Sequence, residues 1–358
     1  MTPMNRTAAL VVLLIVIGAC APAGQPPAQE TAPTSTAVPA PETTATPPVE
    51  TATTQAPTTT TTPETFSYAV VAEERSRRLA VIDPSAPCED NDGACLLTPV
   101  LSIDLPHRPH NLAAAGSVVY ATHTTAGTVS RVDVATEEIL TVAVGVEPHD
   151  IEYDPVRNVL YLTDEEGRSL LTLDPANLEV LSQVDLPGRA HNLAISGSAV
   201  WVTLIGDNRL ARVSGEGMEL FPTGGTPHDL IVDTQGEIWF SNWSSDDLDI
   251  FHSDTGETVQ APIEVVQPHH FALDPDGAVW VSNNGGSSVV RLTGAGTTEV
   301  VVGPVPHHIG FVGETLIVAV SGAGEAVLVR DGEVVGRVAL SEGLHGVAIV
   351  ELSAALEG

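Results

Sequence analysis

Residues 66–358 consist of short apolar runs rich in Val, Ile and Leu, separated by Gly, Asp and Pro. Runs such as 118–122, 159–163 and 289–292 are β-branched and have the length of strands rather than helices. No stretch of this region keeps a helical period. The pattern therefore predicts an all-β domain over residues 66–358.

The runs form units that repeat every 37 to 42 residues, the spacing of four-stranded propeller blades. Each unit opens with a histidine, usually preceded by proline and followed by an apolar strand. The seven openings are Pro109-His110-Asn111, Pro148-His149-Asp150, Ala190-His191-Asn192, Pro227-His228-Asp229, Pro268-His269-His270, Pro306-His307-His308 and Leu344-His345-Gly346.

The two ends of this region complement each other. Residues 68–105 supply a second, third and fourth strand, whereas residues 345–352 supply only a first strand. Pairing the C-terminal strand with the N-terminal strands completes one blade and removes free sheet edges. Six internal blades and this shared blade predict a closed seven-bladed β-propeller, which we expect to be a monomer.

In a propeller the first strand of each blade borders the central channel, so its opening histidine is expected at the channel mouth. The predicted ring comprises His110, His149, His191, His228, His269, His307 and His345, with His270 and His308 as two further candidates. Only the histidine is retained in all seven units. Converging neutral imidazoles are ligands for copper, zinc and other divalent transition ions. The ring therefore predicts a transition-metal site, with copper favoured.

Other polar residues are expected close to this ring. Asp150 and Asp229 follow ring histidines and could fix their tautomers, as carboxylates do for metal-bound imidazole. The ends of the second strands should return to the same rim with Glu73, His123, Asp164, Glu165, Asn242, Trp243 and Asn283. An alternative is a purely structural ring, in which each histidine hydrogen-bonds the loop of the adjoining blade.

Two family resemblances rest on these motifs. The openings, followed by Tyr161-Leu162-Thr163-Asp164, Trp239-Phe240-Ser241-Asn242 and Trp280-Val281-Ser282-Asn283, resemble YVTN-type repeats and are similar to streptogramin (virginiamycin B) lyase. That resemblance implies a seven-bladed propeller and a β-elimination with a histidine base and a magnesium ion held partly by Glu. In sequence, only Glu147 stands beside a ring histidine. The Pro-His motifs also resemble nitrous oxide reductase, whose propeller carries a copper-sulfide cluster, but that enzyme's second copper domain is missing here.

The N-terminal part predicts export and anchoring. Residues 1–20 combine Arg6, a short apolar run and Ile17-Gly18-Ala19-Cys20, which resembles a lipobox with Cys20 as the lipidated residue. Residues 21–65 are rich in Thr, Pro and Ala, which predicts a disordered stalk. We therefore expect an extracytoplasmic protein attached to the bacterial cell membrane. In this oxidising compartment Cys88 and Cys95 are predicted to form a disulfide that ties a surface loop.

Charge narrows the choice of partners. The formal net charge is −32, and every basic residue is Arg, so a nucleic-acid surface is excluded. Three functions remain: a metal-binding surface protein, a lyase-like enzyme acting on an extracytoplasmic small molecule, and a binding scaffold with a structural ring. No Ser-His-Asp order, phosphate loop or cysteine nucleophile is recognisable.

Overall fold

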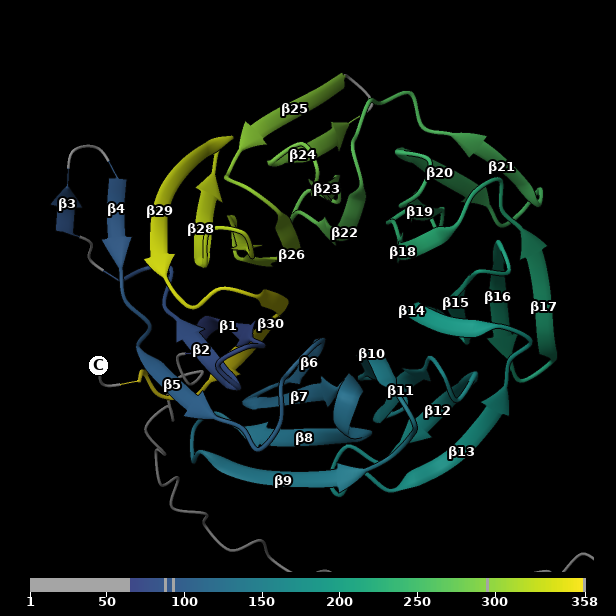
Figure 1. The fold of residues 1–358 in the computed structure, drawn as a ribbon, viewed down its shortest axis with the longest axis horizontal. Helices are drawn as coiled ribbons and strands as arrows, with labels where there is room; N and C mark the ends of the chain where they lie inside the picture. The colour runs from purple at the N-terminus through teal and green to yellow at the C-terminus, as the bar shows by residue number, and fades with distance from the viewer. Residues whose placement is uncertain (1–64, 87–88, 92–93, 294–295, 357–358) are drawn as a thin grey trace, which may run out of the picture. The chain divides into compact units, whose positions relative to one another are not determined.

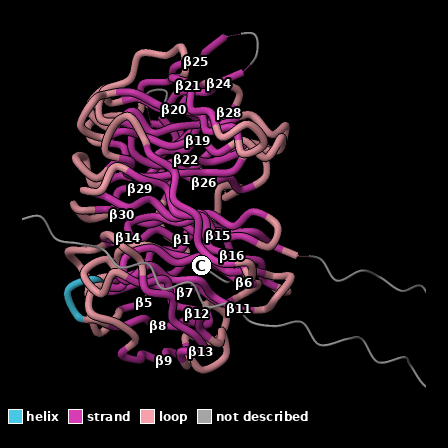
Figure 2. Tube along the Cα trace, turned by 90° about the vertical axis from the view of Figure 1, so that its right-hand side faces the viewer, coloured by secondary structure: helices cyan, strands magenta, loops and turns pink. Residues whose placement is uncertain are grey.

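The computed structural model describes residues 65–86, 89–91, 94–293 and 296–356. These residues form seven sheets arranged in a ring around a central axis (Figure 1). The side view shows strands and loops throughout, with one short 3₁₀ turn, η1 (Thr124–Ala126), in the described part (Figure 2). No helix among the described residues has the length and apolarity needed to cross a membrane. The predicted all-β seven-bladed propeller is confirmed.

Five blades are antiparallel sheets of four consecutive strands. The blade after the closing one comprises β6 (Leu112–Ala115), β7 (Val118–His123), β8 (Thr128–Asp133) and β9 (Glu138–Ala143). The next two comprise β10 (Pro148–Asp154), β11 (Val159–Asp164), β12 (Ser169–Leu173), β13 (Val180–Asp185), and β14 (Arg189–Ser196), β15 (Ala199–Ile205), β16 (Arg209–Ser214), β17 (Gly217–Pro222). Two more comprise β18 (Pro227–Val232), β19 (Ile238–Asn242), β20 (Asp247–His252), β21 (Glu257–Gln260), and β22 (Pro268–Leu273), β23 (Val279–Asn283), β24 (Ser288–Thr293), β25 (Gly296–Val301).

The closing blade joins the two ends of the described chain. Its strand order is β30 (Leu344–Leu352), β1 (Phe66–Glu73), β2 (Arg78–Ile82) and β5 (Leu101–Asp104). The antiparallel register of β1 and β30 runs from Phe66 opposite Leu352 to Glu73 opposite Leu344. The C-terminal strand is thus innermost in a blade whose other strands are N-terminal, as predicted.

The last blade has an unexpected extension. It contains β26 (Pro306–Val312), β27 (Thr315–Val320), β28 (Glu325–Arg330) and β29 (Glu333–Ala339). A hairpin of β3 (Glu89–Asn91) and β4 (Ala94–Leu97), inserted between β2 and β5, lies along the outer edge, with β4 parallel to β29. The predicted tied loop is therefore a hairpin that covers a sheet edge. Cys95 is disulfide-bonded, whereas Cys88 lies outside the described residues.

The core lies between the blades. One apolar cluster joins Tyr68 and Val70 of β1 to Val119 and Ala121 of β7, across a blade boundary. The next residue of β1, Ala69, belongs to a different cluster on the opposite face of its blade. Both faces of β1, the second strand of its blade, are thus buried. This explains why such strands are continuous apolar runs in the sequence rather than alternating apolar and polar residues.

Six of the seven innermost strands carry a β-bulge at the histidine; the seventh, β6, begins after His110 and pairs with β7 without a register shift. In β10, Pro148 pairs with Asp164 and Ile151 with Leu162, so one residue more stands on β10 than on β11. The same register shift recurs in β14, β18, β22, β26 and β30. A bulge redirects a side chain out of the regular pleat, which here sends the histidine towards the channel.

A hydroxyl from the second strand secures the bulge and links it to the next blade. Thr163 Oγ1 accepts a hydrogen bond from the Asp150 amide at 2.9 Å and donates to the His191 carbonyl at 2.6 Å. Equivalent bonds to the next histidine carbonyl are made by Thr122, Thr203 and Ser241. The hydroxyl therefore fixes the backbone of two neighbouring histidines at once.

We expect Thr163→Val to destabilise the propeller by about 1–3 kcal/mol, because the Asp150 amide and the His191 carbonyl lose a buried partner. Urea unfolding followed by circular dichroism measures the free energy of unfolding. Thr297→Val on the exposed outer strand β25 is the matched control and should change stability by less than about 0.5 kcal/mol. Equal effects of the two substitutions would contradict the proposed role of the hydroxyl.

Candidate metal centre

The seven predicted histidines form a closed ring around the channel. Each imidazole contacts the next, with ring centroids 3.6 to 4.8 Å apart from His110 through His149, His191, His228, His269, His307 and His345 back to His110. The ring therefore joins side chains from all seven blades. Such close contact leaves little room between neighbouring imidazoles for anything larger than an ion or a water molecule.

The two further candidates occupy different positions. His308 lines the central cavity, and its imidazole centroid lies 4.5 Å from that of His345. His270 instead accepts a hydrogen bond at Nδ1 from the Ile309 amide of the next blade, at 3.3 Å. His308 thus joins the ring, whereas His270 links two innermost strands.

Asp150 and Asp229 also link strands rather than orient imidazoles. Asp150 accepts hydrogen bonds from the Leu193 amide at 2.9 Å and from Asn111 Nδ2 at 3.0 Å. Asp229 accepts from the amide of Leu230 at 2.7 Å and from the amide of Phe271 on β22 of the next blade. In the described part of the chain neither carboxylate bonds an imidazole, which corrects the expectation that they fix histidine tautomers. Their position directly after the bulge turns them towards backbone amides that the ladder leaves unpaired.

Glu165 is the carboxylate that contacts ring imidazoles, the role expected of Asp150 and Asp229. Its Oε2 lies 2.8 Å from His191 Nδ1 and 3.8 Å from His149 Nε2, and its side chain is buried. The sequence placed Glu165 on the rim but indicated Glu147 as the acid beside the ring. Glu147 is instead partly exposed, and its amide donates to Asp164 at 2.7 Å. The turn after β11 carries Glu165 inward, which linear distance from a histidine cannot reveal.

The other rim residues have structural partners. His123 is held by the Arg108 carbonyl at 2.9 Å and by Ser130 at 2.7 Å, and Glu73 pairs with Arg78. Trp243 is the exception, because its indole stacks on His228, with centroids 5.1 Å apart, and meets His269 edge-on at 5.4 Å. Trp243 therefore covers part of the ring.

Several imidazole nitrogens in the ring are buried and lack a partner. They are Nδ1 of His110, His228, His269 and His345. A repeated packing device would pair each ring nitrogen with the adjoining blade. Nδ1 of His149 does so at the His191 carbonyl, 3.1 Å away, and Nδ1 of His191 does so at Glu165, 2.8 Å away, but these four nitrogens have no such contact. Buried polar atoms without partners are rare in folded proteins, so the ring offers lone pairs to a ligand.

Burial keeps the ring uncharged at neutral pH. It lowers the pKa of both His110 and His228 to about 4. The pKa values of the other ring histidines lie well below 6.5, first because of burial and then because neighbouring imidazoles would repel a second positive charge. Neutral imidazole is the form that ligates metals, so the ring is in its ligand form.

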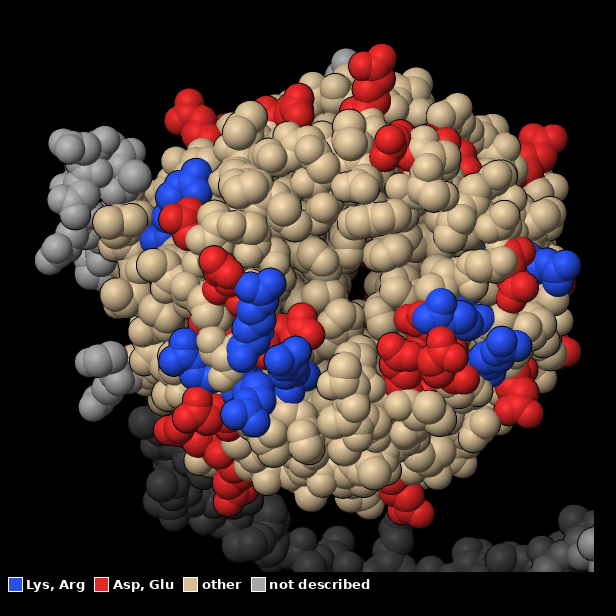
Figure 3. All heavy atoms as spheres, in the orientation of Figure 1, with Lys and Arg blue, Asp and Glu red and all other residues tan. Residues whose placement is uncertain are grey.

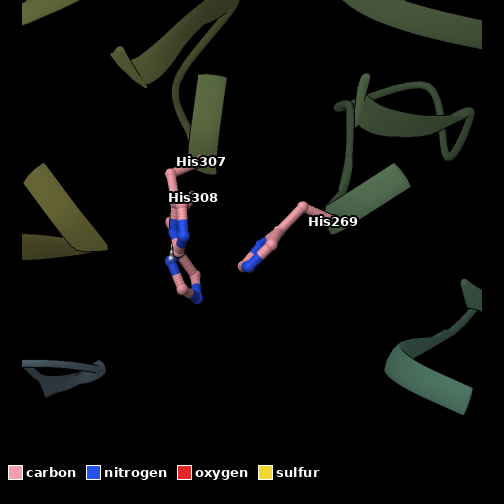
Figure 4. A group of neighbouring side chains, drawn as sticks. All are labelled: His269, His307 and His308. Carbon is pink, nitrogen blue, oxygen red and sulfur yellow. Dashed lines mark hydrogen bonds between the residues drawn. The ribbon is translucent and has the colours of Figure 1, made fainter. Parts of the chain in front are cut away.

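Two groups of side chains have the separations of metal ligands. His269, His307 and His308 bring one nitrogen each within 4.8 Å of one another, as do His149, Glu165 and His191 with their ligand atoms. Figure 4 shows the first group, with His269 approaching from β22 and the other two from β26. His307 Nδ1 and His308 Nδ1 are 3.1 Å apart. These clusters of buried histidines could hold a metal ion.

The space inside the ring is small. The cavity measures about 150 Å³ and is lined by His110, Asn111, His149, His191, Asn192, His228, His269, His308 and His345. The space-filling view down the ring axis shows only a narrow opening at the centre (Figure 3). Pockets for drug-sized molecules measure roughly 300–1,000 Å³. The cavity therefore suits an ion with a few small ligands.

Comparisons with known proteins agree with the fold. No protein-family model matches the chain. A virginiamycin B lyase of Nocardia farcinica is 24% identical over 146 residues, 41% of this chain, which thus spans about half (51%) of that relative's length. A catalytically inactive histidine-to-alanine variant of Staphylococcus aureus virginiamycin B lyase, solved with quinupristin, superposes with a TM-score of 0.56 at 17% identity, covering 62% of this chain and 81% of its own.

A functionally unknown protein from Desulfotomaculum acetoxidans superposes with a TM-score of 0.63 at 18% identity, covering 79% of this chain and 98% of its own. By these likenesses the chain is a virginiamycin B lyase-like seven-bladed β-propeller. At such identities the solved structures bear on the fold alone.

We expect the metal-free protein to lose stability as the pH falls from about 6.5 to about 4. Unfolded histidines take up protons near pH 6.5, whereas burial holds the pKa of His110 and His228 at about 4. Protons therefore favour the unfolded chain, and each excess proton contributes about 1.4 kcal/mol per pH unit.

Buried carboxyls act in the opposite direction, because burial raises the pKa of Asp150 to about 6 and that of Glu152 to about 8, and also raises the pKa of Asp229. Carboxyls with a raised pKa are outnumbered by histidines with a lowered pKa, because His123, His270 and His308 add to the seven of the ring, so the net effect remains a loss. Urea unfolding in the presence of a chelator, repeated across this pH range, measures the loss of stability. A free energy of unfolding that does not change with pH would contradict the expectation.

Proposed function

We propose that this chain is an exported, lipid-anchored protein that binds a transition-metal ion in its histidine ring. The observation that carries the proposal is the group of His269, His307 and His308, whose nitrogens lie within 4.8 Å of one another beside ring nitrogens that lack partners. A buried polar atom without a partner costs about 1–3 kcal/mol. A metal bond to His269 would remove that cost.

The donor set supports Cu²⁺ as the preferred ion. The three ligands are neutral imidazoles without a thiolate, which suits copper, zinc and nickel. Among these ions Cu²⁺ binds nitrogen ligands most tightly. The metal–nitrogen distance of about 2.0–2.1 Å known for zinc requires the three nitrogens to draw together slightly. Rotation of the His269 imidazole, whose Nδ1 is unbonded, provides this adjustment.

Export and anchoring rest on the sequence alone. The signal, Cys20 and the stalk to residue 64 lie outside the described residues. A lipid on Cys20 would keep the propeller at the outer face of the cell membrane, with the stalk as spacer.

We expect the purified full chain to retain Cu²⁺ after dialysis and to bind Zn²⁺ more weakly. His308→Asn should weaken Cu²⁺ binding at least about tenfold, because one of three ligands is lost. Cu²⁺ should also quench the fluorescence of Trp243, which stacks on His228. Elemental analysis and fluorescence titration measure these effects.

His252→Asn is the matched control for that experiment, because His252 lies on β20 and pairs with Glu237 outside the ring. It should leave copper binding unchanged. Failure of the unmodified chain to retain any transition metal at neutral pH would refute the proposal.

A lyase-like activity is the second candidate, and Glu165 favours it. A carboxylate 2.8 Å from His191 and 3.8 Å from His149 unites an acid with two bases at the channel mouth. This arrangement is compatible with the base and the Glu-held magnesium ion that the lyase resemblance implies. Because the cavity is only about 150 Å³, a depsipeptide would have to lie over the rim. The likeness to virginiamycin B lyases makes quinupristin the natural test compound.

A lyase activity predicts that the protein with Mg²⁺ opens the lactone of quinupristin to an isomer of unchanged mass, because elimination adds no water. His149→Ala should abolish the reaction, since it removes a base beside Glu165. Liquid chromatography with mass detection separates this product from a hydrolysis product. Unreacted quinupristin after prolonged incubation would eliminate this candidate.

A further inference from the structure

The ring is chemically asymmetric. His269 and His307 lie on one side of it, whereas His149 and His191 lie on the other, with His228 between the two pairs in one direction and His345 and His110 in the other. The first side offers only nitrogen. The second side adds the buried carboxylate of Glu165, and the two sides therefore offer different ligand sets.

We propose that the ring binds two divalent ions, the second held by His149, Glu165 and His191. This inference deepens the proposed metal-binding function and rests on it. Two imidazoles and one carboxylate on one face are a set suited to Fe²⁺-like ions. The negative charge of Glu165 offsets part of the ion's charge, which the all-imidazole group cannot do. The second site should therefore favour harder ions such as Mn²⁺ and Fe²⁺.

Contacts behind these ligands orient them towards a common point. Arg189 pairs with Glu165 Oε1 and leaves Oε2 directed at the imidazoles. His149 Nδ1 lies 3.1 Å from the His191 carbonyl, which leaves Nε2 between His110 Nε2, at 3.2 Å, and Glu165, at 3.8 Å. Partners of this kind typically change metal affinity 10–100-fold. The site is thus preformed on strands β10, β11 and β14 and their adjoining turn.

Metal binding requires tautomer changes at His191 and at the two neighbouring imidazoles, His110 and His228. Without metal, His191 Nδ1 donates to Glu165, and His191 Nε2 lies 3.1 Å from His228 Nε2. When the ion takes Nδ1, the His191 proton moves to Nε2 and is donated to His228 Nε2, whose own proton moves to Nδ1. When the ion takes His149 Nε2, the proton of His110 likewise moves from Nε2 to Nδ1. The ring contact to His228 therefore accommodates the change of tautomer without leaving a charge behind.

The competing interpretation is a purely structural network of Glu165, Arg189 and His191. Metal-free full chain, titrated separately with Mn²⁺ and Cu²⁺, distinguishes the two. We expect Glu165→Gln to weaken Mn²⁺ binding at least about tenfold while one equivalent of Cu²⁺ still binds. His308→Asn should weaken Cu²⁺ binding and leave Mn²⁺ binding unchanged. Glu166→Gln is the matched control, because Glu166 also pairs with Arg189, at 3.0 Å, but is half exposed.

Electron paramagnetic resonance of Mn²⁺ on the unmodified chain supplies a readout that does not depend on a variant folding. Nitrogen couplings from imidazole are expected, and their absence would overturn the second site. Unchanged Mn²⁺ affinity in Glu165→Gln would overturn it as well. If Cu²⁺ binds but Mn²⁺ does not, the second site fails and the proposed function stands. If neither ion binds, both fail.

Discussion

The β-bulge at the start of six of the seven innermost strands is the constraint on which the centre of the molecule depends. It adds one residue at the histidine and turns the imidazole to the axis. A threonine or serine hydroxyl from the second strand then fixes both this bulge and the next blade's histidine carbonyl. Neighbouring imidazoles are thus positioned by the same hydrogen bonds that hold neighbouring blades together. The same hydrogen bonds therefore determine both the geometry of the candidate metal centre and the assembly of the blades into a ring.

Much of this architecture can be predicted from the sequence, because the sequence consists of repeated units. Seven openings with a fixed histidine are enough to predict the blade count, the shared closing blade and a ring at the channel. Propeller geometry converts a repeated position into a circle, so periodicity alone identifies side chains that lie far apart along the chain. The expected neutral state of the ring also follows, since burial and mutual repulsion act on every member.

Features outside the repeat could not be predicted in this way. Glu165 reaches the ring through the turn after β11, and among the described residues it is the carboxylate whose oxygen groups with two ring histidines. Asp150 adjoins a histidine in sequence, but the bulge directs it to the Leu193 amide. The β3–β4 hairpin joins β29 through backbone pairing, which leaves no side-chain pattern to recognise. A residue adjacent to a ring histidine in sequence does not contact the ring where the local backbone turns its side chain elsewhere.

The closing blade also determines when the centre can exist. The innermost strand of that blade, β30, ends at Leu352 of 358 residues, and it carries the last member of the histidine ring. Six innermost strands, from β6 to β26, precede β30 in the chain. Strands β1, β2 and β5 form a complete blade only when β30 pairs with β1. The circle of imidazoles is therefore complete only when β30 has paired with β1, and blades formed before that pairing hold an open arc of histidines rather than a closed ring.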